Sequence, residues 1–188
     1  MQRWREILDL WFGPKADASL WFGADPGVDR TVRERFSGLL ADAVAGRLAS
    51  WEESPESAAA LVVLLDQFAL QLHRKQREGY DGSTQALAVS QRAIAKGFDK
   101  RLSRDRRGFL YMPFMHAEDP ALQERSVELF SGLAREYPEA LTIGGFLKSA
   151  IEHRDIVRKY GRFPGRNQAY GRPNTPAEQE YLDQGGHF

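Results

Sequence analysis

The sequence contains no cysteine. Disulfides, thiolate nucleophiles and zinc sites with sulfur ligands are therefore excluded, and the composition is typical of a protein from a reducing compartment. The chain also lacks an excess of either charge, because 26 Lys and Arg residues balance 26 Asp and Glu residues. A neutral chain has no overall attraction for nucleic acid or anionic lipid, so we predict neither as a partner.

The sequence has no apolar run long enough to cross a membrane. The longest run, Ala58 to Leu65, ends at Asp66, whereas a spanning helix needs about 20 such residues. The first residues, Met1 to Glu6, have the pattern of an amphipathic helix and not of a signal peptide. We therefore expect a cytoplasmic protein. With 188 residues, of which 42% are apolar, the composition predicts one globular domain over residues 1–188.

A helix-start signal, a capping residue followed by proline, occurs four times: Asp25-Pro26, Ser54-Pro55, Asp119-Pro120 and Thr175-Pro176. The side-chain oxygen accepts a backbone N–H, and proline suits the first helical position. Apolar residues recur at helical spacing after these signals, and no segment alternates like a strand. We predict helices over residues 2–12, 26–45, 55–74, 84–96, 104–117, 120–136, 138–160 and 176–183. The sequence thus predicts an all-α fold of antiparallel helix pairs.

Two histidines lie on apolar helix faces. His116 follows Phe109 and Met112 at helical spacing and precedes Glu118, while His153 lies on the apolar stripe of a later helix. An imidazole beside a carboxylate can act as a metal ligand or a general base, or it can be a core side chain whose nitrogens are satisfied. Because the two histidines lie on different helices, their spacing gives no support for a metal. We predict no metal and no cofactor.

A buried acid is expected at Asp66, which lies beside the apolar residues Leu65 and Phe68. An unpaired buried charge is costly, so we expect a partner for it. Arg154 or an arginine of the segment 161–174 is the candidate. An arginine partner for Asp66 fits a structural ion pair at least as well as it fits a catalytic acid.

The segment 161–174, GRFPGRNQAYGRPN, is rich in arginine and glycine and contains no acid. Its arginines are Arg162, Arg166 and Arg172. Glycines expose backbone N–H groups, and guanidinium groups match phosphate or carboxylate, so the segment could hold an anion. Equally, its arginines could attach an irregular loop to acidic helix faces. The segment lacks the lysine and the strand–loop–helix context of a P-loop.

Several strings of the sequence resemble the bacterial family called domain of unknown function 924 (DUF924). They are Leu65-Asp66-Gln67-Phe68, Tyr111-Met112-Pro113 with His116 and Glu118, and His153-Arg154-Asp155-Ile156, which is followed by Gly161-Arg162-Phe163-Pro164 and Arg166-Asn167. The resemblance covers essentially the whole chain. It implies an all-helical, tetratricopeptide-like (TPR-like) right-handed stack of about eight helices, and it implies no activity.

The chain departs from the family pattern in two places. The family usually reads Pro-Arg-Asn after Phe68, where this chain has Ala69, Leu70 and Gln71, and it usually has histidine at the position of Gly165. If the polar residues of the family form a site, this chain has lost an arginine and a histidine from it. The polar residues that still match are Asp66, Arg74, His116, Glu118, His153, Arg154, Arg162, Arg166 and Asn167.

We predict that these matching side chains line a polar cleft between helices, which binds a small anionic molecule or an acidic peptide end. Two alternatives stay open. One is a hydrolase-type enzyme in which His116 or Glu118 is the general base and arginines stabilise developing negative charge. The other is a protein-interaction scaffold in which the polar cluster is purely structural.

Overall fold

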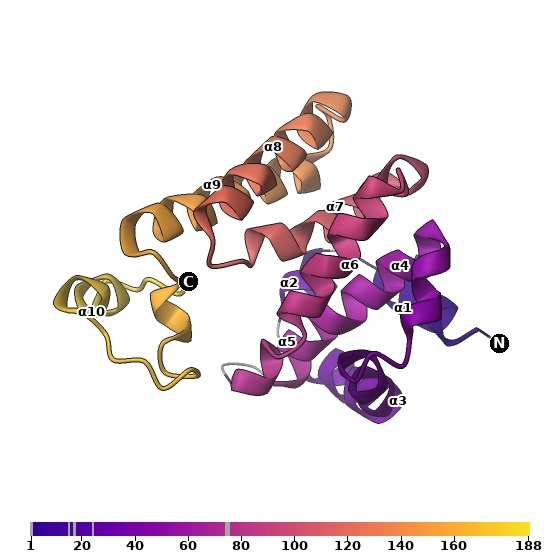
Figure 1. Ribbon diagram of the computed structural model, residues 1–188, viewed down its shortest axis with the longest axis horizontal. Coiled ribbons are helices and arrows are strands. Elements are labelled where there is room, and N and C mark those ends of the chain that lie inside the picture. Colours follow the sequence, from indigo (N-terminus) through magenta and orange to yellow (C-terminus); the bar gives the residue numbers. More distant parts are fainter. Residues whose placement is uncertain (1, 15, 17, 24, 74–75) are drawn as a thin grey trace. The chain divides into compact units, whose positions relative to one another are not determined.

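The computed structural model describes residues 2–14, 16, 18–23, 25–73 and 76–188, and these are helical or irregular with no strand among them (Figure 1). The all-α prediction is thereby confirmed, whereas the tetratricopeptide-like stack stays a prediction. The chain divides into two compact units. The N-terminal unit comprises residues 1–74 and 78–113, and the C-terminal unit comprises residues 75–77 and 114–188.

The N-terminal unit is built around an aromatic core. Its helices are α1 (Arg3–Phe12), α2 (Ala18–Phe22), α3 (Pro26–Val44), α4 (Pro55–Val62), α5 (Ala69–Leu72), α6 (Ser83–Ala95) and the part of α7 (Arg104–Met115) up to Pro113. Helix α4 packs against α1 and α6. Trp11 is fully buried, and its ring centroid lies 5.4 Å from that of Phe68 and 5.7 Å from that of Phe109. These edge-on contacts join three helical segments.

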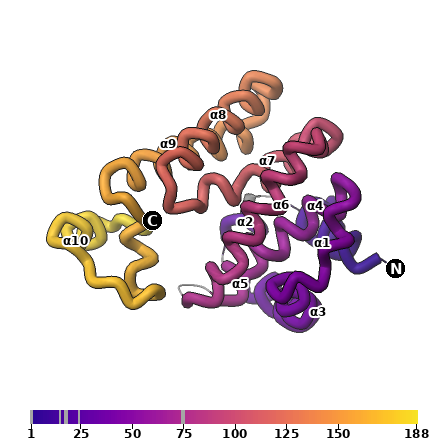
Figure 2. Tube along the Cα trace, in the orientation of Figure 1, coloured from indigo at the N-terminus to yellow at the C-terminus, as the bar shows by residue number. Residues whose placement is uncertain are grey.

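The C-terminal unit contains a helical hairpin followed by an irregular segment. Its helices are α8 (Pro120–Glu136), α9 (Leu141–Tyr160) and α10 (Pro176–Asp183). Figure 2 shows α8 and α9 side by side, and the rings of Phe130 and Phe146 join them at 5.9 Å between centroids. Gly161 ends α9 with a φ of 73°, a left-handed conformation that favours glycine. From there the chain runs through a short 3₁₀ turn, η5 (Pro164–Arg166), to α10.

All four predicted caps form. Asp25, Ser54, Asp119 and Thr175 each accept a hydrogen bond from a backbone N–H of the first turn of their helix. Thr175 and Glu178 exchange the two hydrogen bonds of a capping box. A cap of this kind stabilises a helix by about 1 kcal/mol, so local chemistry determines where these helices begin.

Three predicted boundaries need correction. The helix predicted over residues 55–74 contains a π-helical turn, η2 (Val63–Phe68), and ends at Leu72. The helix predicted over residues 104–117 ends at Met115, and the one predicted from residue 138 begins at Leu141. Helix α2 lies where no helix was predicted. No described helix is long and apolar enough to span a membrane.

Candidate functional site

The C-terminal unit brings the two histidines together. His116 lies in the turn after α7, and His153 lies in the fourth turn of α9. Their ring centroids are 5.9 Å apart. The aromatic ring of Phe163 lies 5.4 Å from the ring of His153. The imidazoles of two separate elements therefore lie next to each other.

The His153 side chain is buried and neutral. Its exposed fraction is 8%, and Nδ1 lies 2.8 Å from the carbonyl oxygen of Ser149. A carbonyl oxygen can only accept, so Nδ1 carries the proton and Nε2 is left as an acceptor. Burial is the main cause that lowers the pKa of His153 to about 3, and electrostatic interactions with the nearby His116, Arg166 and His187 act in the same direction.

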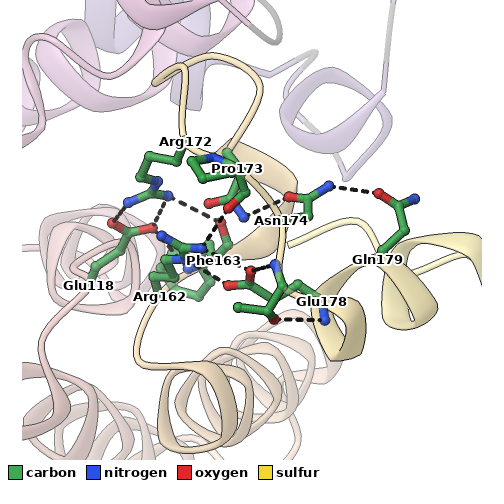
Figure 3. A network of polar contacts seen from close by, with 10 residues as sticks. Glu118, Arg162, Phe163, Arg172, Pro173, Asn174, Glu178 and Gln179 are labelled. Atoms are coloured by element: carbon green, nitrogen blue, oxygen red, sulfur yellow. Dashed lines mark hydrogen bonds and ion pairs between the residues drawn. The ribbon is translucent and has the colours of Figure 1, made fainter.

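Glu118 is clamped by Arg172 (Figure 3). The guanidinium donates to both carboxylate oxygens, with Nη1–Oε2 and Nη2–Oε1 distances of 2.6 and 2.9 Å. The backbone N–H of Phe163 donates to Oε1 at 2.8 Å. Burial acts to raise the pKa of Glu118, but these hydrogen bonds and the charge of Arg172 outweigh it and leave that pKa lowered. The carboxylate thus fastens the 161–174 segment to the turn after α7.

A second clamp joins Arg162 to Glu178 at the start of α10 (Figure 3). The Nε–Oε1 and Nη2–Oε2 distances are 2.6 and 2.8 Å, and Arg162 also donates to the carbonyl oxygen of Pro173. The hydrogen bond from Arg162 is the main reason that the pKa of Glu178 falls to about 2. The prediction from sequence missed Glu178 as a site residue, although Thr175 and Glu178 have the spacing of a capping box.

Arg166 and Asn167 lie in the same region. The Nη1 of Arg166 donates to the carbonyl oxygen of His116 at 2.8 Å, and its guanidinium lies over the ring of Phe163 at 4.5 Å from the centroid. Asn167 is buried, and its Nδ2 donates to Oδ1 of Asn174 at 2.8 Å. The Oδ1 of Asn167 has no hydrogen-bond partner among the described residues. Arg166 therefore joins the 161–174 segment (called the arginine segment below) to the imidazoles of His116 and His153.

The remaining predicted site residues are Arg154, Asp66 and Arg74. Arg154 was a candidate partner for Asp66, but it donates to its neighbour Asp155 at 2.7 Å. Asp66 belongs to the N-terminal unit, where it is 2% exposed within the π-helical turn and accepts a hydrogen bond from Gln67 at 2.6 Å. Arg74 lies outside the described residues.

The segment 186–188 also reaches the site, which the sequence did not indicate. The ring of Phe188 lies 4.0 Å from the ring of His153 between centroids, and its carbonyl oxygen accepts a hydrogen bond from the backbone N–H of Gly165. No periodicity or motif in these residues marks such a contact. Within the described part of the chain, no three His, Asp or Glu side chains are grouped so that they could hold a metal ion.

Comparisons with known proteins place most of the chain in one family. No curated protein matches it. It is similar to the solved structure of a protein of unknown function from Agrobacterium tumefaciens, with 37% identity, a TM-score of 0.86, and coverage of 96% of this chain and 97% of that one. The family described as bacterial protein of unknown function (DUF924) matches residues 7–186. The chain therefore belongs to the DUF924 family of bacterial proteins.

Proposed function

We propose that the C-terminal unit binds a small anionic molecule or an acidic peptide end beside His116, His153 and Arg166. One observation carries the proposal. The guanidinium of Arg166 donates to the carbonyl oxygen of His116, whose ring lies 5.9 Å from the buried ring of His153. Burial is the main cause that lowers the pKa of His153, and the charge of Arg166 acts in the same direction, which indicates a positive potential at that imidazole. An anion placed there would therefore be stabilised.

The two acids clamped by arginines do not cancel this potential. Glu118 and Glu178 each form two hydrogen bonds with one arginine. The negative charge of each carboxylate is therefore balanced by the positive charge of its own arginine. The neutral His153 adds a hydrogen-bond acceptor at Nε2. A ligand that carries an anionic group next to a hydrogen-bond donor would satisfy both features of the site.

The clamp on Glu118 argues against a role as general base. A carboxylate that accepts three hydrogen bonds and has a lowered pKa is a weak base. The clamp gives Glu118 a positioning role, since it holds the 161–174 segment next to the imidazole pair. We therefore infer a binding function in which Glu118 does not act as a general base.

Thermal unfolding in the presence of anions tests this proposal. The probes are inorganic phosphate and the acidic dipeptide acetyl-Asp-Glu. At 100 times its dissociation constant a ligand stabilises the folded state by about 2.7 kcal/mol, which raises the melting temperature by several degrees. We expect Arg166→Ala and His116→Ala to abolish this rise, and Arg125→Ala, an exposed arginine on α8 paired with Glu128, to keep it.

Two results would overturn the proposal. One is a rise in melting temperature that is the same in all three variants, because the anion would then act elsewhere. The other is a melting temperature of Arg166→Ala or His116→Ala that falls, without any anion, by as much as a core truncation causes. In that case the polar cluster would be structural.

A further inference from the structure

Residues 187 and 188 lie at the His116–His153 site. Phe188 is half-buried, with its ring 4.0 Å from the His153 ring, and the ring of His187 lies 4.3 Å from that of Phe188. On another side His153 contacts the ring of Phe163. One imidazole thus touches two aromatic rings, one from the arginine segment and one from residue 188.

The backbone of residues 187 and 188 lies close to Gly165 and is hydrogen-bonded to it. The N–H of Gly165 donates to the carbonyl oxygen of Phe188. A Cβ at position 165 would lie 2.7 Å from the carbonyl oxygen of His187 and 2.9 Å from that of Phe188, so any side chain there would displace the segment. Gly186 lies against the ring of Tyr181, where a Cβ would also collide. Two positions without side chains make this arrangement possible.

We propose that the ligand of this site is a peptide whose last residue is aromatic, and that residues 186–188 occupy the same place and compete with it. The inference rests on the proposed function for the location of the site, and it names the ligand class. Phe188 makes two contacts that such a peptide would make: its ring lies on an imidazole, and its carbonyl oxygen accepts from a backbone N–H. The guanidinium of Arg166, which lies over the ring of Phe163 and donates to the carbonyl oxygen of His116, would favour the carboxylate at the end of such a peptide.

Residues 186–188 have the properties of a segment that a ligand could displace from the site. His187 is exposed, and Phe188 lies beyond helix α10 in irregular backbone. The family match ends at residue 186, so the two residues that reach the site lie outside the matched stretch. A weakly held segment that occupies a binding site lowers the apparent affinity for a ligand. The apparent affinity is the intrinsic affinity multiplied by the fraction of time that the site is free.

Peptide titrations of four proteins test the inference. They are the full chain, a variant that ends at Gly186, Phe188→Ala and Gly165→Ala. The probe is acetyl-Gly-His-Phe with a free carboxylate, and binding is followed by calorimetry and by the NMR signals of the His153 imidazole. We expect the shortened chain and Phe188→Ala to bind the probe at least about tenfold more tightly than the full chain. The amide form of the probe should bind more weakly than the free acid.

Gly165→Ala separates occupancy from folding. Its Cβ would exclude both residues 186–188 and the probe, so the His153 signals should move as they do in the shortened chain while the probe fails to bind. Gly132→Ala is the matched control, because a Cβ at that helical position meets nothing within 4 Å. It should behave like the unaltered chain in both measurements.

The outcomes distinguish this inference from the proposed function. If the shortened chain binds phosphate or acetyl-Asp-Glu but not acetyl-Gly-His-Phe, the ligand class is wrong and the anion site remains. If it binds none of the three, both proposals fail. If the His153 signals do not change when residues 187 and 188 are removed, the segment does not occupy the site and the inference is overturned.

Discussion

The two units of this protein are stabilised in different ways. In the N-terminal unit, Trp11 joins Phe68 and Phe109 in an aromatic core, and burial of apolar surface supplies most of the stability. In the C-terminal unit, the α8–α9 hairpin has such a core, but the segment that follows is held by two arginine–carboxylate clamps. Apolar burial is insensitive to pH near neutrality, whereas the clamps and the buried imidazole respond to proton concentration.

The largest expected effect is in the aromatic core. Trp11→Ala should destabilise the N-terminal unit by about 3–5 kcal/mol, because it removes a fully buried ring and leaves a cavity. All four tryptophans, Trp4, Trp11, Trp21 and Trp51, belong to this unit, so tryptophan fluorescence during urea unfolding reports it alone. A loss below about 1 kcal/mol would show that this core is not the main source of stability.

A smaller effect is expected in the second clamp. Glu178→Gln keeps an oxygen for the capping box but removes the charge that Arg162 binds, and we expect a loss of about 2 kcal/mol. Circular dichroism of the full chain during urea unfolding measures it. The control is Glu128→Gln, which breaks an exposed pair with Arg125 in the same unit and should cost less than about 0.5 kcal/mol. Equal losses in the two variants would mean that the buried clamp adds nothing beyond a surface pair.

The smallest effect is a pH dependence specific to the C-terminal unit. The pKa of His153 is about 3 in the folded protein and 6.5 when exposed, so between these values the unfolded chain binds more protons. Stability should therefore fall as the pH falls below 6.5, by at most about 1.4 kcal/mol per pH unit. The slope, measured by urea unfolding between pH 6.5 and 5, should disappear in His153→Gln. A slope that persists in this variant would assign the effect to another group.

Much of the fold could be predicted because its signals are local. The bounds of α8 and α10 agree with the prediction, since each begins at a cap and a proline that act within one turn. The π-helical turn at Val63–Phe68 could not be predicted in this way. Over six residues the apolar pattern of a π-turn cannot be told from that of an α-helix, and tertiary packing decides between them.

The site was predictable only in part, for a related reason. The inward faces of His116 and His153 follow from helical spacing, and the structure brings the two rings together. The pairing of acids with arginines does not follow from spacing, because many partners of equal charge were available to Glu118 and Arg154. The contact of Phe188 with His153 depends on the path of an irregular segment, for which the sequence carries no periodic signal.

The carboxylate of Glu178 connects two folding events. It caps α10 through the N–H of Thr175 and at the same time binds Arg162, which lies 16 residues earlier. A helix of eight residues is too short to persist by itself in water. We therefore expect α10 to form only when the arginine segment closes onto it, so that the excised peptide 170–188 would be a random coil and the helix a product of loop closure.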